Sequence, residues 1–281
     1  MVRQVSGAGA VALAQWGAMR EAGLEAVFDA DYAYFMRADH TADFNRREAG
    51  IAMRAAGLQP GMRVLDAGCG YGRIALEMAR YGMSVHGVDC SRHLVELART
   101  DAACHHLPAG FEATDLRHLT ARGAFDAALM WCTAFGYTTD PDSDLILRLL
   151  HRGLRPGGRL LIDALNPLPQ REQAAAGPVL CLRRVGADFM LDEITVDDAT
   201  GRLASRRTVV RDRILRTCHW SMRLLDPHEW ERWLHGAGFT DVRFLGDAGE
   251  SFTPADRRLL VTARTPEPAT SQPYLTTTCT Q

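Results

Sequence analysis

The sequence predicts an α/β fold in which helices cover both faces of a mostly parallel sheet. Between residues 63 and 165, short apolar segments alternate with helical segments in the order strand, helix, strand. Turn residues separate these segments, with Pro60-Gly61 before the first strand and Pro156-Gly157-Gly158 before the strand Arg159 to Ala164. Because parallel strands need crossover connections, this alternation is typical of a doubly wound sheet.

The composition favours a cytoplasmic protein of enzyme size. With 281 residues and 47% hydrophobic content, the chain can form one large domain or two modest ones. A formal charge of −2 gives no global attraction to nucleic acid or to anionic membranes, and no stretch approaches the length of a membrane span. The seven cysteines form no CxxC pair and are expected to be reduced. His105-His106 lacks the ligand spacing of a metal site, so we expect no metal.

Changes in residue pattern divide the chain into four predicted units. They are an N-terminal helical lid (1–45), an α/β core (46–166 and 224–265), an inserted antiparallel meander (167–223) and a disordered tail (266–281). Helix-forming residues from Ala10 to Leu58 predict the lid, which carries the aromatic cluster FDADYAYFM at 28–36. The tail is rich in Pro and Thr.

Apolar and polar residues alternate along the insert, as they do in antiparallel strands with one buried face. The predicted strands are Val179–Arg184, Phe189–Val196 and a longer segment, Leu203–Arg223, with a turn at residues 199–201. The core then resumes with a helix from Pro227 to Ala237 and two strands near residues 242–245 and 258–265.

The segment VLDAGCGYGR at 64–73 contains the first predicted strand and a glycine-rich turn after it. Asp66 ends the strand, and Gly68 and Gly70 allow a ligand to approach the backbone before the next helix begins. Alone, such a segment is equally consistent with a tight strand-to-helix connection. Asp89, however, ends the second strand 23 positions after Asp66, where a carboxylate can accept both hydroxyls of a ribose. The spacing therefore predicts a nucleoside ligand.

A dinucleotide fingerprint starting at Gly68 would need a small residue at position 73, where this chain has Arg73. Instead, DxGxGxG, the acidic end of the second strand, Asp115-Leu116, FDAALMWC and LRPGGRLLID resemble class I S-adenosylmethionine-dependent methyltransferases. The resemblance spans roughly residues 45–265. It implies a Rossmann-like, mostly parallel, seven-stranded sheet and S-adenosyl-L-methionine as cofactor.

The resemblance assigns the cofactor-binding residues position by position. It places the methionine part at Asp66, Gly68 and Gly70, and the ribose at Asp89. The remaining positions matched to the cofactor site are Arg73, Cys90 beside the adenine, Asp115 at the adenine amino group, Leu116 beside the ring, and Trp131 closing over the cofactor. The alternative interpretation of Asp115 is a solvated loop acid, and that of Trp131 is ordinary core packing.

Methyl transfer from a sulfonium is an in-line displacement that needs few dedicated catalytic residues. Tyr32 and Tyr34 in the lid are candidates to hold or deprotonate the nucleophile, or they only pack the lid onto the core. Tyr137 in CTAFGYTTD is a candidate substrate contact. His219 is a candidate general base and Arg223 a candidate partner of a substrate carboxylate; strand alternation places both on one face and Trp220 on the other.

These features predict transfer of a methyl group to an amine or hydroxyl of a small molecule, in specialised metabolism. An RNA or protein methyltransferase remains an alternative, although WCTAFGY stands where an NPPY-like tetrapeptide would end the fourth strand. A second alternative is a non-catalytic, regulatory binder of S-adenosylmethionine, because the motif reports binding and not turnover. A homo-oligomer in which the lid forms a subunit contact is also open.

Overall fold

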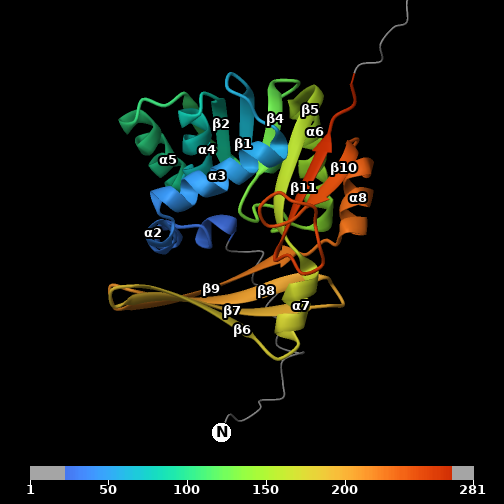
Figure 1. Cartoon of the computed structure of the whole chain (residues 1–281). Helices are drawn as coiled ribbons and strands as arrows, with labels where there is room; N and C mark the ends of the chain where they lie inside the picture. The colour runs from blue at the N-terminus through green and yellow to red at the C-terminus, as the bar shows by residue number, and fades with distance from the viewer. Residues whose placement is uncertain (1–22, 268–281) are drawn as a thin grey trace, which may run out of the picture.

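The computed structural model describes residues 23–267, which form a seven-stranded sheet and a separate four-stranded sheet (Figure 1). The large sheet has the order β10-β11-β5-β4-β1-β2-β3, in which the last five strands run parallel and β11 runs antiparallel to both of its neighbours, β5 and β10. Its strands are β1 (Arg63–Ala67), β2 (Ser84–Asp89), β3 (Ala109–Ala113), β4 (Phe125–Met130), β5 (Leu154–Leu165), β10 (Thr240–Leu245) and β11 (Arg258–Arg264). The predicted fold class is confirmed.

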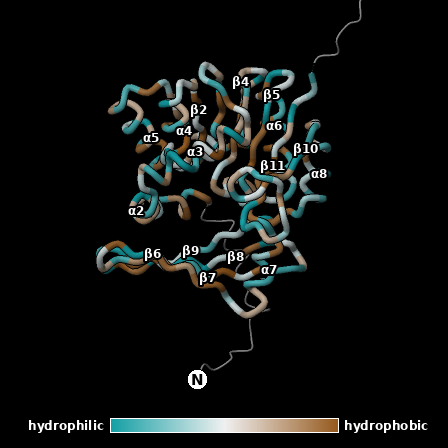
Figure 2. Tube along the Cα trace, viewed as in Figure 1, coloured by the Kyte–Doolittle hydropathy of each residue, from teal (hydrophilic) through white to brown (hydrophobic). Residues whose placement is uncertain are grey.

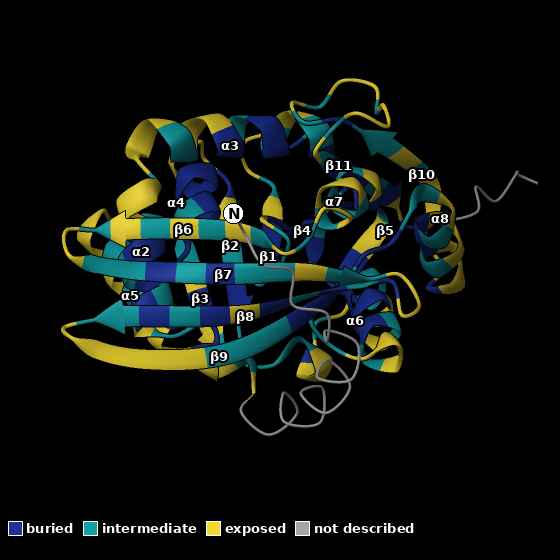
Figure 3. Cartoon of the chain, turned by 90° about the horizontal axis from the view of Figure 1, so that it is seen from below, coloured by how far each residue is buried: buried dark blue, intermediate teal, exposed yellow. Residues whose placement is uncertain are grey.

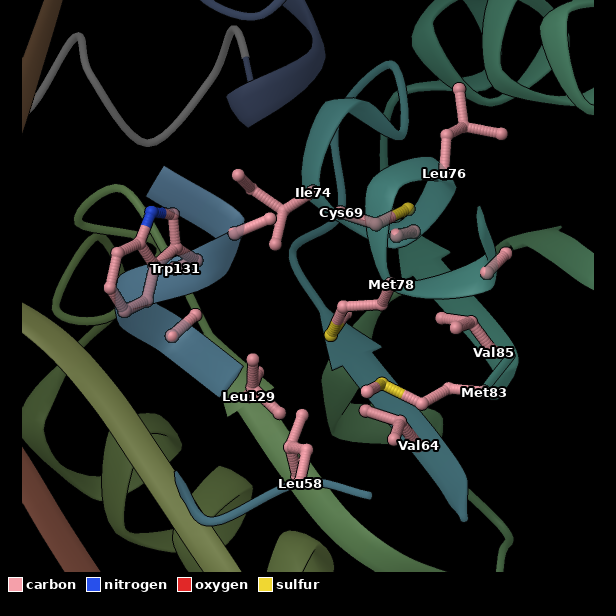
Figure 4. Close-up of a cluster of buried hydrophobic side chains, with 14 of the residues drawn as sticks. Leu58, Val64, Cys69, Ile74, Leu76, Met78, Met83, Val85, Leu129 and Trp131 are labelled. Atoms are coloured by element: carbon pink, nitrogen blue, oxygen red, sulfur yellow. The ribbon is translucent and has the colours of Figure 1, made fainter. Parts of the chain in front are cut away.

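Helices cover both faces of the large sheet because successive strand residues point to opposite sides. Val64 packs in the cluster beneath α3, α4 and α5, whereas Leu65 packs beneath α6 and α8. These helices are α3 (Ala42–Ala56), α4 (Arg73–Arg80), α5 (Arg92–Cys104), α6 (Asp140–Gly153) and α8 (Pro227–Gly236). Figure 4 shows part of the first cluster, to which α4 contributes Ile74 and Met78 and β4 contributes Leu129. Within residues 23–267, no helix has the length and apolar character needed to cross a bilayer.

The four-stranded antiparallel sheet lies across one end of the core and has the order β6-β7-β8-β9 (Figure 3). Its strands are β6 (Val179–Val185), β7 (Asp188–Asp197), β8 (Arg202–Arg211) and β9 (Ile214–Arg223). The predicted single segment 203–223 is therefore two strands. Asp212 and Arg213 form the turn between them, with left-handed φ values of 53° and 65°. Because this turn contains no Gly or Pro, the residues that mark most turns, the sequence did not indicate it. Residues 167–174, which the sequence assigned to the meander, form helix α7 (Pro167–Ala174).

The segment before α3 joins the small sheet to the core. It contains a short 3-10 helix, η1 (Leu24–Ala26), and α2 (Ala30–Asp39), which begins at the capping side chain of Asp29. Charged and polar contacts hold α2 on the small sheet: Asp31 pairs with Arg211, and the Tyr34 hydroxyl donates to Asp188 at 3.1 Å. Figure 2 shows hydrophobic residues concentrated in the strands of the large sheet. The predicted lid residues 1–22 and tail residues 268–281 lie outside the described residues.

Candidate functional site

A cavity of about 880 Å³ lies between the large sheet, α2 and the small sheet. Residues at the carboxyl ends of β1, β2 and β4 line it, among them Asp66, Asp89 and Trp131. The strand order reverses between β1 and β4, and a doubly wound sheet opens a ligand crevice at such a point. The topology therefore places the main cavity where this class of sheet binds ligands.

The glycines after β1 form a close backbone turn on the floor of this cavity. Gly68, Gly70 and Gly72 have φ values of 79°, 54° and 78°, a region that only glycine enters without strain. A Cβ on Gly68 would also lie 2.6 Å from the Cβ of Ala134. Helix α4 begins directly afterwards without a side-chain cap, so its first N–H groups are available to an anionic ligand group.

Asp89 connects the end of β2 to this turn. Its Oδ2 accepts the Gly70 N–H and its Oδ1 accepts the Ser91 N–H, both at 2.8 Å. Burial raises the pKa of Asp89, while the two backbone donors oppose that shift. Cys90 follows in the cavity wall, where burial raises the pKa of its thiol to about 12. Asp89 thus holds the glycine turn and still borders the cavity, as a ribose-binding carboxylate must.

Asp66 precedes the glycine turn and Arg73 follows it, and both line the cavity. Burial raises the pKa of Asp66 to about 7, although the nearby Arg73 guanidinium lowers it. The Nη1 of Arg73 is buried and has no hydrogen-bond partner among residues 23–267. A buried guanidinium nitrogen without an acceptor is costly, and a ligand carboxylate would supply one. The glycine turn, Asp89 and Arg73 therefore fit a cofactor with an amino-acid part and a ribose.

Asp115 and Leu116 line the cavity beyond the ribose-side residues. The Asp115 carboxylate accepts from Arg117 Nη2 at 2.6 Å, and this partner lowers the pKa of Asp115. Arg117 reaches Asp142 of α6 at 3.2 Å as well. The side chain expected to meet an adenine amino group is thus already paired with an arginine in this structure.

Aromatic side chains form the wall opposite the glycine turn. Phe28 meets Tyr32 and Tyr137 edge to face, with ring centroids 5.1 and 5.2 Å apart, and Tyr137 lies 5.8 Å from Trp220. All four line the cavity. Burial raises the pKa of Tyr137 to about 12, and burial raises that of Tyr32 well above its usual value. Both phenols therefore stay protonated at neutral pH.

Two predicted site residues lie outside the cavity. The Tyr34 hydroxyl binds Asp188, and the Arg211 guanidinium lies 4.3 Å from the centre of its ring, so Tyr34 fastens α2 to the small sheet. Arg223 donates to the backbone oxygens of Gly201 and Leu224 and binds Glu229 at 2.6 Å. Neither residue lines the cavity. These two expectations are corrected: both side chains are used in contacts between elements.

The alternation predicted for β9 holds, but it places Trp220 on the cavity side. Trp220 Nε1 donates to Asp192 at 3.1 Å, and Asp192 pairs with Arg207 on the same face. His219, the preceding residue on the strand, pairs with Arg206 and alternates to the other face, yet it also lines the cavity. Its Nε2 is buried without a partner among the described residues.

The sequence reasoning missed several lining residues. Arg207 and Asp192 form a buried pair, with Arg207 Nε 2.9 Å from Asp192 Oδ1, and Arg207 Nη1 donates to the Val27 oxygen. His40 Nδ1 lies 2.5 Å from the Tyr71 hydroxyl. Burial, reinforced by Arg73 and Arg183, lowers the pKa of His40 to about 4, so its ring is neutral at pH 7. The sequence offered one signal for the Asp192–Arg207 pair. Both are charged residues in strands whose apolar and polar residues alternate, and both stand at positions that face inward.

Comparisons with known proteins agree with this geometry. Residues 64–158 match a family model described as a methyltransferase domain. The chain is 28% identical over 207 residues to the ubiquinone biosynthesis O-methyltransferase of Xanthomonas oryzae pv. oryzae, covering 73% of this chain and 72% of that protein.

Two solved structures share the fold. The CcbJ methyltransferase from Streptomyces caelestis has a TM-score of 0.67 at 22% identity, covering 79% of this chain and 89% of that one. CalS10 from Micromonospora echinaspora, an amino pentose methyltransferase solved with S-adenosylmethionine, has a TM-score of 0.53 at 19% identity, covering 94% and 100%.

The doubly wound sheet with a glycine turn and an acidic second-strand end defines a nucleoside-cofactor enzyme of the α/β class. The matched domain specifies the transferred group. The chain contains a class I S-adenosylmethionine-dependent methyltransferase domain, and its cofactor is S-adenosyl-L-methionine.

Proposed function

We propose that this enzyme methylates an amine or hydroxyl group of a small molecule in specialised metabolism. The observation that carries the proposal is the aromatic wall of Phe28, Tyr32, Tyr137 and Trp220, which lines the same cavity as the glycine turn. Such a wall suits an acceptor ring or an ammonium-bearing group, and a cavity of about 880 Å³ suits small ligands. CalS10, by its description, acts in calicheamicin biosynthesis, and the Xanthomonas relative methylates oxygen, by its name.

On the cofactor side, the glycine turn and Arg73 would hold the methionine part, and Asp66 its ammonium group. Asp89 would accept the ribose hydroxyls, while Cys90 and Leu116 would border the adenine. Arg117 would have to share or release Asp115 for the adenine amino group. When bound, the cofactor supplies an electrophilic methyl group on a positively charged sulfur.

The protein's own contribution is alignment of the acceptor and exclusion of water. Because burial raises their pKa values, Tyr32 and Tyr137 are neutral phenols. Neutral phenols serve poorly as proton-abstracting bases, but their oxygens orient an acceptor by hydrogen bonding. The aromatic faces around them favour a developing positive charge on a nitrogen acceptor. We therefore assign Tyr32 and Tyr137 to acceptor orientation, not to deprotonation.

A labelled-methyl assay tests the function. The purified enzyme is incubated with S-adenosylmethionine carrying a labelled methyl group and with separate panels of amines, phenols and amino sugars. Transfer to at least one small acceptor is expected. Tight cofactor binding without transfer to any panel, or transfer only to RNA or protein added in parallel, would overturn the proposal.

Removing the hydroxyl of Tyr32 or Tyr137 should lower turnover and spare cofactor binding. For Tyr32→Phe and Tyr137→Phe we expect turnover to fall by roughly 10- to 100-fold, because an orienting hydrogen bond to the acceptor is lost. Tyr34→Phe is the matched control, since its hydroxyl lies outside the cavity on Asp188. Turnover rates and calorimetric cofactor affinities are measured for all three variants. Wild-type turnover in the first two would confine those tyrosines to packing.

Arg73 should discriminate cofactors by their carboxylate. Arg73→Gln is expected to weaken binding of S-adenosylmethionine by about 10- to 100-fold, because a charge-assisted hydrogen bond in a buried site is lost. Binding of decarboxylated S-adenosylmethionine should be weak in the wild type and little changed by the substitution. Equal losses for both ligands would show that Arg73 does not contact the carboxylate.

A further inference from the structure

Two successive non-glycine residues after β4 adopt left-handed backbone conformations. Cys132 has a φ of 56° and Thr133 a φ of 58°, and both line the cavity. This region is unfavourable for residues with a Cβ, and a β-branched residue such as threonine is especially disfavoured there. Such conformations persist only where the surrounding structure holds them, and they cluster at functional sites. The turn therefore needs an external support.

Asp163 of β5 supplies that support through two different atoms. Its carboxylate Oδ2 accepts the Cys132 N–H at 2.8 Å, and its backbone oxygen accepts the Thr133 N–H at 3.1 Å. Asp163 is only 3% exposed, so its carboxylate cannot turn to water instead. One residue of β5 thus binds both left-handed residues.

Arg258 of β11 in turn fixes the Asp163 carboxylate. Its Nη2 and Nε donate to Oδ2 and Oδ1 at 2.8 and 3.0 Å, a two-point contact that prevents rotation of the carboxylate. Arg258 also pairs with Glu48 of α3 at 3.1 Å, and its guanidinium lies 4.7 Å from the centre of the Trp131 ring. Trp131 Nε1 donates to the same Glu48 at 3.2 Å. The contacts that support the turn therefore connect β5, β11 and α3.

We propose that Asp163, held by Arg258, is a positioning residue that sets the cavity wall at Cys132 and Thr133. Neither Asp163 nor Arg258 lines the cavity, so both act through the turn. The turn directly follows Trp131, which lines the cavity and which the sequence matched to the cofactor site, and the inference rests on that site. A relaxed turn would shift Trp131 and so weaken cofactor binding.

Rescue by glycine distinguishes this role from a general structural one. Asp163→Ala is expected to weaken S-adenosylmethionine binding about tenfold, measured by calorimetry. Cys132→Gly alone should change the affinity by less than about twofold, because Cys132 is the residue whose N–H binds the Asp163 carboxylate and glycine adopts its left-handed conformation without steric cost. Combined with Asp163→Ala, it should restore most of the lost affinity. Both Asp163→Ala proteins leave Arg258 equally unpaired, so a general loss of stability cannot produce this recovery.

Asp212→Gly provides the matched control, because Asp212 is also left-handed, at φ 53°, but lies in the β8–β9 turn outside the cavity. In the Asp163→Ala background it should restore nothing. Should Asp163→Ala fail to fold, Asp163→Asn, which keeps an oxygen for the Cys132 N–H, should show a smaller loss that Cys132→Gly again reverses. Absent binding by the wild type would contradict the cofactor site itself. Wild-type affinity in Asp163→Ala, or no recovery with Cys132→Gly, would overturn the positioning role alone.

Discussion

Replacing Asp89 by alanine should weaken S-adenosylmethionine binding by about 2 to 3 kcal/mol, or roughly 30- to 150-fold. Two losses combine in this variant. The proposed hydrogen bonds to the ribose disappear, and the Gly70 N–H loses the acceptor that holds the glycine turn at 2.8 Å. Calorimetric titration with S-adenosylmethionine and S-adenosylhomocysteine measures the effect, which should be similar for both because they share the ribose.

Asp126→Ala is the control for this prediction, because it removes a carboxylate that accepts a backbone N–H away from the cofactor site. Asp126 Oδ2 also accepts a backbone N–H, that of Arg63 at 2.6 Å, but it lies near the amino ends of β1 and β4. We expect Asp126→Ala to leave the cofactor affinity within about twofold, since the crevice opens at the carboxyl ends. Equal losses in the two variants would contradict the placement of the ribose at Asp89.

The parts of the fold that follow from local pattern were predictable. Buried strands such as β1 and β4 are apolar runs ended by turn residues, and glycines 68, 70 and 72 occupy positions whose φ values require them. The edge strand β3, Ala109–Ala113, has only Phe111 fully buried and gives no comparable signal. The seventh strand was implied by the resemblance to class I methyltransferases, and not by the pattern of apolar residues. Periodicity reports burial, and an edge strand is buried too little to show it.

The acceptor side of the site was less predictable, because it depends on which face of each strand meets the core. For β9 the alternation of Trp220 with His219 and Arg223 was predicted, but nothing local indicates which face turns inward. The choice is made by distant partners: Trp220 donates to Asp192, thirteen residues before its own hairpin partner Ser205. His219 can be chosen as a candidate base from its residue type alone. The buried ion pair of Asp192 and Arg207 can be recognised only from the structure, because its two residues are distant in the sequence.

The largest loss of stability is expected at that ion pair. Asp192 and Arg207 are 2% and 6% exposed, and Asp192 also accepts from Ser205 and Trp220. Asp192→Ala leaves the Arg207 guanidinium buried without its counter-charge, so we expect the free energy of unfolding to fall by about 3 to 5 kcal/mol. Urea denaturation followed by circular dichroism measures this change. Because Arg207 also binds the Val27 oxygen, the variant should lose the contact between the small sheet and the segment before α2.

An adjacent pair on the same two strands provides the control. Glu193 and Arg206 also join β7 to β8, with Arg206 Nη1 3.0 Å from Glu193 Oε2, but their side chains are 35% and 55% exposed. Double-mutant cycles on both pairs compare ion pairs that differ mainly in burial. The coupling should be about 2 kcal/mol or more for Asp192–Arg207, and below about 1 kcal/mol for Glu193–Arg206, where water screens the charges. Equal couplings would mean that the inward face of the small sheet is as hydrated as its outer face, and the cavity would then lack the dry wall on which the acceptor site depends.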